Sequence, residues 1–287
     1  MSDRYEYMAS KLTQPLKWHG GKGAFGGQLA QWIISLMPPH VHYVETHFGG
    51  GSVLLNKDPE GISEVVNDIN FDLTTFWSVL SDPEAFPIFR RAMETTPFSQ
   101  PVWNVARDAL SWGDIGSSID RARWFFICCR QSRAGQMNEF APLSRNRTRR
   151  GMNEQASAWL TAVEGLPAVH ARLKRVAIVT EDALTVIRRE DGPKTLFYCD
   201  PPYLHETRAS TADYEHEMTR QQHEELLERL ATIKGRFLLS GYRSSLYDDF
   251  ATGVGWKRHE FKIPNNASGG KKKRVMTECV WSNDENG

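Results

Sequence analysis

The segment Thr195–Tyr203 places the strongest constraint on how this chain can fold. It begins with an apolar run of strand length, Thr195–Cys199, and continues as Asp200-Pro201-Pro202-Tyr203. Neither proline can donate a hydrogen bond to a neighbouring strand, and each fixes its own φ, so the strand has to end there. Because ligands bind at the carboxyl ends of strands in an open α/β sheet, we expect Asp200 and Tyr203 on a stiff loop at such an edge.

The side chains of this loop narrow the chemistry that it can support. Asp200 offers a carboxylate acceptor, Pro201 offers a main-chain carbonyl, and Tyr203 offers a flat aromatic face. Two acceptors beside a ring suit the exocyclic amino group of a planar base that stacks on that ring. The plain alternative is an ordinary strand stopped by prolines, and this stretch alone leaves both interpretations open.

Other stretches alternate between strand and helix patterns. Strands are expected at 41–45, 64–68, 176–179, 195–199, 236–240, 256–263 and 275–282. Apolar residues at helical spacing lie between them, and Thr219-x-x-Gln222 forms a capping box before one such helix. The alternation predicts an α/β fold with a Rossmann-like, doubly wound, mostly parallel seven-stranded sheet, closed by a C-terminal antiparallel hairpin.

Two glycine-rich stretches precede expected helices. Glu45–Ser52 follows the first strand and leads into a helix expected at Val53–Leu55, the arrangement used for a nucleoside-bearing cofactor. Its spacing is not Gly-x-Gly-x-x-Gly, so we do not expect a dinucleotide site. The stretch Trp18–Gly23 lets the backbone approach a ligand and carries Lys22, but it also fits an ordinary turn before a helix.

Acidic residues follow two more of the expected strands. Asp68 stands where an acid commonly binds ribose hydroxyls, although it also suits the N-cap of the next helix, and the two roles are compatible. Asp182 follows the strand at 176–179 and adds another polar group to the same edge. These acids favour a cofactor site at the carboxyl ends of the strands.

Residues 82–170 differ in character from the rest of the chain. Prolines separate short helical pieces, and we expect an inserted, mainly helical target-recognition domain at 82–170 within a catalytic domain of residues 1–81 and 171–287. The chain has 35 Lys and Arg and 35 Asp and Glu, so a nucleic-acid binder with this balance must concentrate its basic residues locally.

Residues 121–150 provide such a concentration, with eight arginines and a single acid, Glu139. Arg, Asn and Gln side chains can read the edges of guanine and adenine, which favours nucleic-acid contact over a merely solvated loop. A basic run at 271–274 between the last two strands fits either a phosphate contact or a solubilising tip. The candidate nucleic-acid-binding residues are Arg130, Arg133, Asn138, Arg145, Arg147, Arg149, Arg150 and Lys272.

The four cysteines, 128, 129, 199 and 279, show no Cys-x-x-Cys spacing. We therefore expect a reduced, cytoplasmic protein without a structural zinc site, and no other metal-ligand pattern is present. There is no signal peptide and no apolar run long enough to span a membrane, so no membrane partner is expected. Nothing in the sequence indicates an obligate protein partner.

Four blocks, in this order, resemble the Dam-like family of DNA adenine N6-methyltransferases. They are Lys17-Trp18-His19-Gly20-Gly21-Lys22, Glu45–Ser52, Asp68-Ile69-Asn70 and Asp200-Pro201-Pro202-Tyr203. The resemblance covers about residues 15–282, more loosely over 82–170, which leaves the target sequence open. In the second block, Thr46-His47 replaces the family's usual Pro-Phe.

The resemblance implies the cofactor S-adenosylmethionine and transfer of its methyl group to N6 of a flipped-out adenine in double-stranded DNA. It implies that Asp200 and the Pro201 carbonyl accept hydrogen bonds from the amino group, within a catalytic set of Asp200, Pro201, Pro202 and Tyr203. Tyr203 would stack on the base, and neither a cysteine nucleophile nor a metal is needed. The implied cofactor-binding residues are Trp18, Lys22, Phe48, Gly49, Gly51, Ser52, Asp68, Asp182 and Asp200.

Several alternatives share these residues. An RNA adenine N6-methyltransferase could use the same catalytic loop, and so could an N4-cytosine methyltransferase, although such enzymes more often carry serine in place of Asp200. A catalytically silent DNA-binding protein on the same fold is the alternative outside enzymes. No nuclease motif stands out, which favours a solitary methyltransferase over a fused restriction enzyme.

Overall fold

The computed structural model describes residues 12–18, 20–23, 27–113, 115–207, 217–264 and 275–284. The chain divides into two compact units. Residues 1–30, 49–58 and 72–176 form the first, called here the helical unit, and residues 31–48, 59–71 and 177–287 form the second, called the sheet unit. The expected insert, 82–170, falls inside the helical unit, and its role as a recognition domain stays a prediction.

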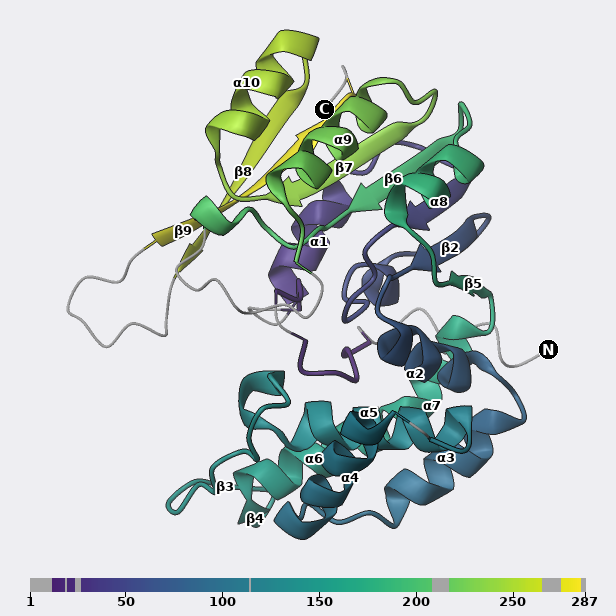
Figure 1. Cartoon of the computed structure of the whole chain (residues 1–287), viewed down its shortest axis with the longest axis vertical. Helices are drawn as coiled ribbons and strands as arrows, with labels where there is room; N and C mark the ends of the chain where they lie inside the picture. The colour runs from purple at the N-terminus through teal and green to yellow at the C-terminus, as the bar shows by residue number, and fades with distance from the viewer. Residues whose placement is uncertain are drawn as a thin grey trace. The chain divides into compact units, whose positions relative to one another are not determined.

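A seven-stranded sheet with the order β5-β2-β1-β6-β7-β9-β8 confirms the expected fold class (Figure 1). β1 pairs in parallel with β2 and with β6, and β6 pairs in parallel with β7. The strand bounds are β1 His42–Glu45, β2 Ser63–Asn67, β5 Val176–Val179, β6 Thr195–Cys199, β7 Arg236–Gly241, β8 Lys257–Pro264 and β9 Val275–Ser282.

The C-terminal hairpin is present, but its two strands take different places in the sheet. β9 lies between β7 and β8 and is antiparallel to both, so β8 forms the edge and runs in the same direction as β7. Burial explains this order, because Cys279, Val280 and Trp281 are at most 1% exposed, whereas β8 is rich in polar residues. The more apolar strand is therefore inside the sheet.

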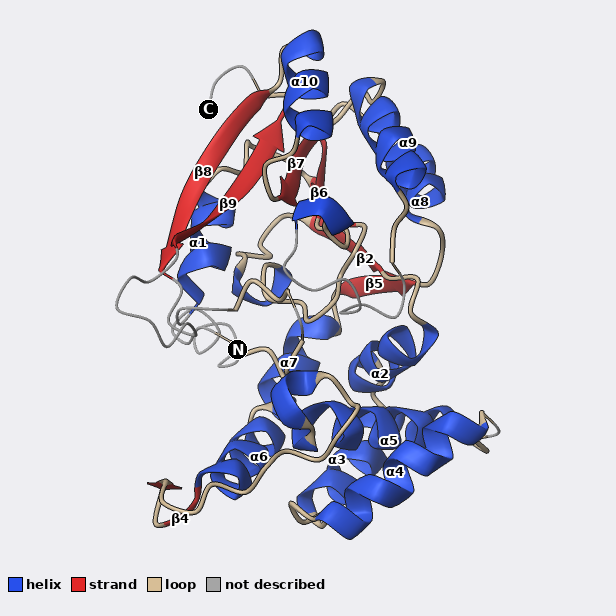
Figure 2. Ribbon diagram, turned by 60° about the vertical axis from the view of Figure 1, so that its left-hand side comes forward, coloured by secondary structure: helices blue, strands red, loops and turns tan. Residues whose placement is uncertain are grey.

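Helices cover both faces of the sheet in the sheet unit. One face packs against α8 (Ala183–Glu190), α9 (Arg220–Ala231) and α10 (Ser245–Val254), with a shared apolar core. On the other face lies α1, Gln28–Ser35, where the Trp32 ring is 5.2 Å from that of Phe261 on β8 (Figure 2). The capping box predicted at Thr219 is present at the start of α9.

The helical unit is built on packed aromatic side chains. Phe76 stacks on Phe126 with ring centroids 5.5 Å apart, and Trp159 lies 5.3 Å from Phe126. None of the described helices is long and apolar enough to cross a membrane. The elements outside the sheet that remain are α2 Phe71–Ser81, α3 Ala85–Glu94, α4 Gln100–Trp112, α5 Ser118–Gln131, α6 Glu154–Glu164, α7 Leu166–Leu173, the two-residue strands β3 Thr148–Arg149 and β4 Met152–Asn153, and the short 3-10 helices Leu54–Asn56, Arg133–Gly135 and His205–Thr207.

The helix expected at Val53–Leu55 is only the 3-10 turn Leu54–Asn56. Lys57 already has an extended backbone, with ψ of 143°, and Pro59 follows two residues later. A proline disfavours helical geometry in the residue before it, so the turn has no room to extend into an α-helix.

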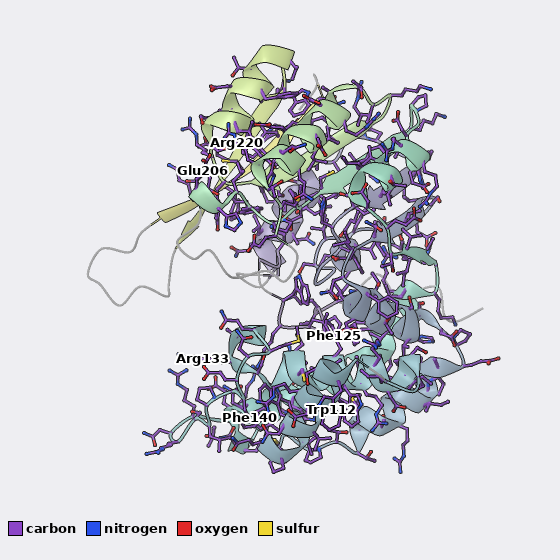
Figure 3. The ribbon with its side chains drawn as sticks, viewed as in Figure 1. Trp112, Phe125, Arg133, Phe140, Glu206 and Arg220 are labelled. Carbon is purple, nitrogen blue, oxygen red and sulfur yellow. The ribbon has the colours of Figure 1, made fainter. Side chains whose placement is uncertain are left out.

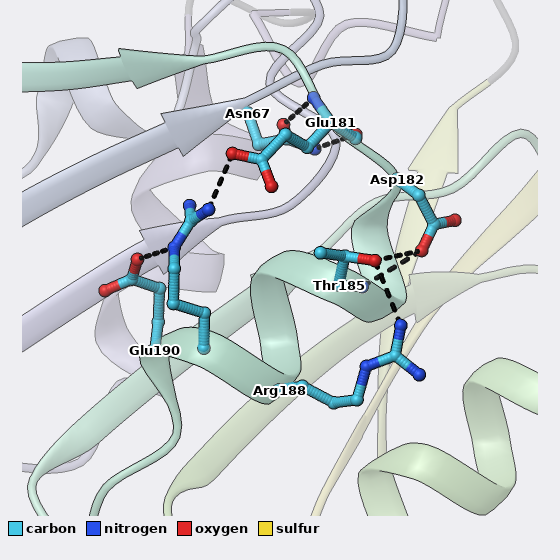
Figure 4. Close-up of polar contacts among 7 residues, drawn as sticks. Asn67, Glu181, Asp182, Thr185, Arg188 and Glu190 are labelled. Atoms are coloured by element: carbon cyan, nitrogen blue, oxygen red, sulfur yellow. Dashed lines mark hydrogen bonds and ion pairs between the residues drawn. The ribbon is translucent and has the colours of Figure 1, made fainter.

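A single buried amide, Asn67 at the end of β2, joins three strand ends, and Figure 4 shows its contacts with Glu181 after β5. Its Nδ2 donates to the carbonyl of Thr46 and to that of Glu181, each at 3.0 Å, and its Oδ1 accepts from the Glu181 amide at 2.9 Å. The Phe48 amide donates to the Asn67 carbonyl at 2.8 Å. The loops after β1, β2 and β5 therefore share one hydrogen-bonded joint.

We expect Asn67→Asp to destabilise the protein by about 3 kcal/mol, because the substituted carboxylate keeps the shape but faces two carbonyl oxygens without a donor. Urea denaturation measures the free energy of unfolding. Asn283 is the matched control, since it bridges Gly235 and Phe237 at the other end of the sheet. Its side chain is only half-buried, so Asn283→Asp should cost about 1 kcal/mol. Equal losses for the two variants would contradict the special role of Asn67.

Candidate active site

β1 and β6 lie side by side at the point where the strand order reverses. From β1 the chain continues to β2 and β5 on one side, and from β6 it continues to β7 on the other. Ligands of open α/β sheets bind outside such a switch point, at the carboxyl ends of the strands. The loop after β1 begins there with Thr46, whose amide donates to the Tyr198 carbonyl at 3.1 Å.

Asp200 follows β6 at this point, as the proline argument predicts. Its side chain is half-buried, Pro201 is buried and Pro202 is half-buried. Tyr203 is 9% exposed, and its ring meets that of Tyr242 edge-on with centroids 4.7 Å apart. Its hydroxyl donates to Glu278 and lies 3.4 Å from Oδ1 of Asp200. The stacking of a base on Tyr203 stays a prediction.

Acidic groups and tyrosines gather at this edge of the sheet unit. Glu45, at the end of β1, is 1% exposed and accepts from the Tyr43 hydroxyl at 2.7 Å. The Tyr198 hydroxyl lies 3.0 Å from Oγ of Ser240. Burial, followed by the nearby carboxylates, raises the pKa of Tyr43, Tyr198 and Tyr203 well above its usual value. At neutral pH these phenols therefore keep their protons and act as donors.

Glu278 is the residue of this edge that sequence reasoning missed. It lies on β9, far from Asp200 in the sequence, and is 3% exposed. Because β9 runs antiparallel to β7, its early residues lie beside the end of β7, where Gly241 pairs with Cys279. The only signal in the sequence is an acid directly before the buried run Cys279–Ser282.

Asp68 and Asp182 stand at the ends of β2 and β5, on either side of the Asn67 joint. Asp68 is half-buried, and its Oδ1 accepts from the Asn70 amide at 3.0 Å, a turn just before α2. Asp182 is exposed and caps α8, with Oδ2 accepting from the Thr185 amide at 2.9 Å (Figure 4). Asp182 therefore caps α8, whereas Asp68 forms a turn just before α2.

The remaining predicted cofactor residues, apart from Phe48, belong to the helical unit. Trp18 lies against the glycine loop so closely that a Cβ on Gly49 would be 2.8 Å from its Nε1, and Gly49 has φ of 50°. Both observations require glycine there. The Gly49 carbonyl accepts from Nε1 of Trp77 at 3.0 Å. Lys22 is 4% exposed and donates to the Gly20 carbonyl, and Ser52 donates to Gln14.

Phe48 ends the part of the glycine loop that belongs to the sheet unit. It is 4% exposed, and Gly51, in the helical unit, has φ of 70°. In the sheet unit, the structure thus brings Phe48, Asp68, Asp182 and the Asp200 loop to one edge of the sheet. Trp18, Lys22, Gly49, Gly51 and Ser52 form a second group around the glycine turn of the helical unit.

The candidate nucleic-acid-binding residues fall into two classes. Arg130 is half-buried, its Nη2 donates to the Ala158 carbonyl at 2.9 Å, and burial lowers its pKa. The others in the described chain are exposed: Arg133, Asn138, Arg145, Arg147, Arg149 and Arg150. Lys272 lies outside the described residues. Arg130 thus contributes to the packing of the helical unit, and its contact with nucleic acid stays a prediction.

The exposed arginines differ in whether an acidic residue pairs with them. Arg133 bonds Glu139 at 2.9 Å, and its side chain projects from the surface of the helical unit (Figure 3). Arg150 is held by both oxygens of Glu164, at 2.9 and 3.0 Å. Arg147 is 3.9 Å from Glu154. Arg145 and Arg149 have no such partner among the described residues, and Arg149 stands beside the turn of the β3–β4 hairpin.

All four cysteines are buried and free. Burial raises the pKa of Cys199 to about 12, so its thiol is protonated at neutral pH. A protonated, enclosed thiol is not a nucleophile, which agrees with a packing role for Cys199 beside the catalytic loop.

His47 stands where the sequence block it resembles usually has phenylalanine, and its environment lowers the pKa of its imidazole. Its Nδ1 is 2.9 Å from Oγ1 of Thr46. Burial, with help from His223, lowers its pKa from 6.5 to about 4 despite the opposing effect of Asp182. The imidazole in the folded protein is therefore neutral at physiological pH.

Between pH 6.5 and 4 the unfolded chain binds a proton at His47 and the folded chain does not, so stability falls as the pH is lowered through this range. The full difference is about 3 kcal/mol. We expect His47→Phe to remove this contribution, so that its free energy of unfolding falls less steeply from pH 6.5 to 4 than that of the wild type. Parallel pH profiles from urea denaturation would refute the buried, neutral imidazole.

A search of the curated proteins finds no match. Among solved structures, the chain is similar to a SAM-dependent methyltransferase from Agrobacterium tumefaciens, with 12% identity, a TM-score of 0.36 and coverage of 88% of this chain but only 59% of that one. It is also similar to the rRNA methyltransferase aviRa from Streptomyces viridochromogenes, with 12% identity, a TM-score of 0.39 and coverage of 88% and 82%. These two likenesses carry no further argument.

The family comparison is decisive. The family model of the D12 class N6 adenine-specific DNA methyltransferases matches residues 18–100 and 146–262, which is more than half of the chain. The match includes Trp18, the glycine loop, Asp68 and the Asp200 loop, and it identifies S-adenosylmethionine as the cofactor. The chain belongs to the D12 class of N6 adenine-specific DNA methyltransferases.

Proposed function

We propose that this protein is a site-specific DNA methyltransferase that transfers a methyl group from S-adenosylmethionine to N6 of a flipped-out adenine. One observation carries the proposal: Asp200 stands on a proline-locked loop at the carboxyl end of β6, beside β1 at the switch point of the sheet. A rigid acceptor at that position suits an amino group that has to be held and polarised.

The residues present fit S-adenosylmethionine. Asp68 and Asp182 stand at neighbouring strand ends fixed by Asn67, and carboxylates are suitable partners for hydroxyl or amino groups. Gly49 and Gly51 have positive φ, a conformation that favours glycine. The turn therefore carries no side chain at these two positions. We assign cofactor binding to the residues predicted from the sequence, with Asp200 at its border. When bound, this cofactor supplies an electrophilic methyl group on a positively charged sulfur.

The chain's own residues would act on the base. The N6 lone pair of adenine is delocalised into the ring, which makes the amino group a weak nucleophile. Hydrogen bonds from that group to Asp200 and to the Pro201 carbonyl localise the lone pair, while the two prolines hold both acceptors in place. After transfer, N6 must lose a proton, and the Asp200 carboxylate is the nearest acceptor in this arrangement.

Duplex DNA is the proposed substrate because the family is DNA-specific and because exposed arginines gather on the loops of the helical unit. An adenine within a duplex cannot reach Asp200, so base flipping is part of the proposal. RNA adenine, N4 of cytosine and DNA binding without catalysis are the competing outcomes. Methyl transfer assayed in parallel on duplex DNA, single-stranded DNA and RNA separates them.

We expect Asp200→Asn to lower methyl transfer at least about 100-fold, because it replaces a charged acceptor with an amide that also donates. The assay follows tritiated methyl groups into DNA, and thermal unfolding checks that the fold is retained. Asp249→Asn, an exposed acid on α10, is the control and should keep full activity. Substantial activity in Asp200→Asn would sink the catalytic assignment.

We expect Arg145→Ala combined with Arg149→Ala to weaken DNA binding and to reduce the slope of log K against log salt by about 2, one per lost phosphate contact. Fluorescence anisotropy across a salt series measures that slope. The matched control is Arg90→Ala combined with Arg107→Ala, two exposed arginines of the same unit that are paired with Glu94 and Asp108. An identical slope in both double variants would exclude the hairpin arginines from the interface.

A further inference from the structure

We propose that Glu278 is a positioning residue that keeps Asp200 available for substrate by holding the hydroxyl proton of Tyr203. The inference rests on the proposed function of the Asp200 loop. It assigns a role in the reaction to a β9 residue that lies outside all four sequence blocks and outside the matched residues 18–100 and 146–262.

The Tyr203 hydroxyl has a choice between two carboxylate acceptors. Its hydroxyl has two carboxylates within reach, Glu278 at short range and Oδ1 of Asp200 at 3.4 Å. A phenol has a single proton to donate. Because that proton is directed to Glu278, the hydroxyl makes at most a long contact with Asp200.

Burial and packing fix this direction. Tyr203 is 9% exposed and its ring is held edge-on against Tyr242, so the hydroxyl cannot swing into solvent. Glu278 is 3% exposed on a strand whose other residues are mainly apolar. Burying a carboxylate costs free energy unless it is hydrogen-bonded, which Glu278 achieves through Tyr203. A hydrophobic residue would serve packing alone, so the acid indicates a different requirement.

The neighbouring tyrosines Tyr43 and Tyr198 also have hydrogen-bond partners other than Asp200. Tyr43 donates to Glu45 at 2.7 Å, and the Tyr198 hydroxyl lies 3.0 Å from Ser240. Tyr43 and Tyr198 therefore each have a partner other than Asp200 at normal hydrogen-bond distance. All three stay protonated at neutral pH, since burial and the nearby carboxylates raise the pKa of each.

The consequence concerns how well Asp200 polarises an amino group. A carboxylate that accepts a strong hydrogen bond from a phenol gives up a lone pair and part of its charge density. Hydrogen bonds to a charged acceptor are about twice as strong as those to a neutral one. If Glu278 lost its charge, Asp200 would become the stronger acceptor for Tyr203, and the amino group of the substrate would have to compete.

A double-mutant cycle on methyl transfer tests this dependence. We expect Glu278→Gln, which keeps the size of the side chain, to lower kcat about tenfold while leaving the KM for S-adenosylmethionine within about twofold. In a Tyr203→Phe background the same substitution should change kcat less than about twofold, because no phenol proton is left to redirect. In a Tyr198→Phe background the loss should stay about tenfold, since Tyr198 has Ser240 as its partner.

Three kinetic results would overturn the proposal. One is an unchanged kcat in Glu278→Gln. The second is a tenfold loss that is equal in the wild-type and Tyr203→Phe backgrounds, which marks a structural role for Glu278. The third is a Tyr203→Phe variant without measurable turnover, which would mean that the hydroxyl itself takes part in the reaction.

A crystal structure of Glu278→Gln tests the same idea without any activity. We expect the distance from the Tyr203 hydroxyl to Asp200 to shorten from 3.4 Å to about 2.7 Å. An unchanged distance would overturn the positioning role. A shortened distance in a protein whose wild type transfers no methyl group to adenine would refute the proposed function and leave the hydrogen-bond assignment intact.

Discussion

The hydrogen bonds of Asn67 are the interaction on which the arrangement of the sheet unit depends. Parallel strands that end at one edge leave backbone groups that must find partners, because a buried, unpaired carbonyl or amide costs about 1–3 kcal/mol. Asn67 supplies partners for Thr46 and Glu181 in one step. The acids that follow, Asp68 and Asp182, are thereby fixed relative to the loop after β1. One buried amide thus determines where three candidate ligand loops begin.

The antiparallel strand β9 also contributes a residue to this edge of the sheet. The parallel strands deliver their carboxyl ends to one edge, so the polar residues there come after the strand and are visible in the sequence as strand-then-polar patterns. β9 arrives from the opposite direction and places the side chain of a residue near its own start, Glu278, at that same edge. A reversed strand can therefore add a buried carboxylate to the site without interrupting any of the parallel strands.

The sequence predicts the elements well where one signal dominates. The prolines after Cys199, the capping box at Thr219 and the apolar runs of the strands each act locally, and the structure confirms them. It predicts poorly where a residue's role depends on a partner far along the chain. Asn67 joins loops 21 and 114 residues away, and Tyr203 meets a carboxylate 75 residues away. Arg130 shows a related limit, since a count of charges does not reveal which guanidinium is half-buried and bonded within its own unit.

Acids gather at one edge of the sheet unit, while exposed arginines gather on one loop of the helical unit. Glu45, Asp200 and Glu278 concentrate negative charge at the sheet edge, which suits a cationic sulfonium cofactor and would repel DNA phosphates. The proposed phosphate contacts would therefore come from another surface, and exposed arginines lie on loops of the helical unit. Acids on the helices neutralise many of its other arginines, as Glu94 does for Arg90. Under the proposed function, a chain of zero net charge would hold a cation at one edge and present positive charge to DNA from the loop that carries Arg145 and Arg149.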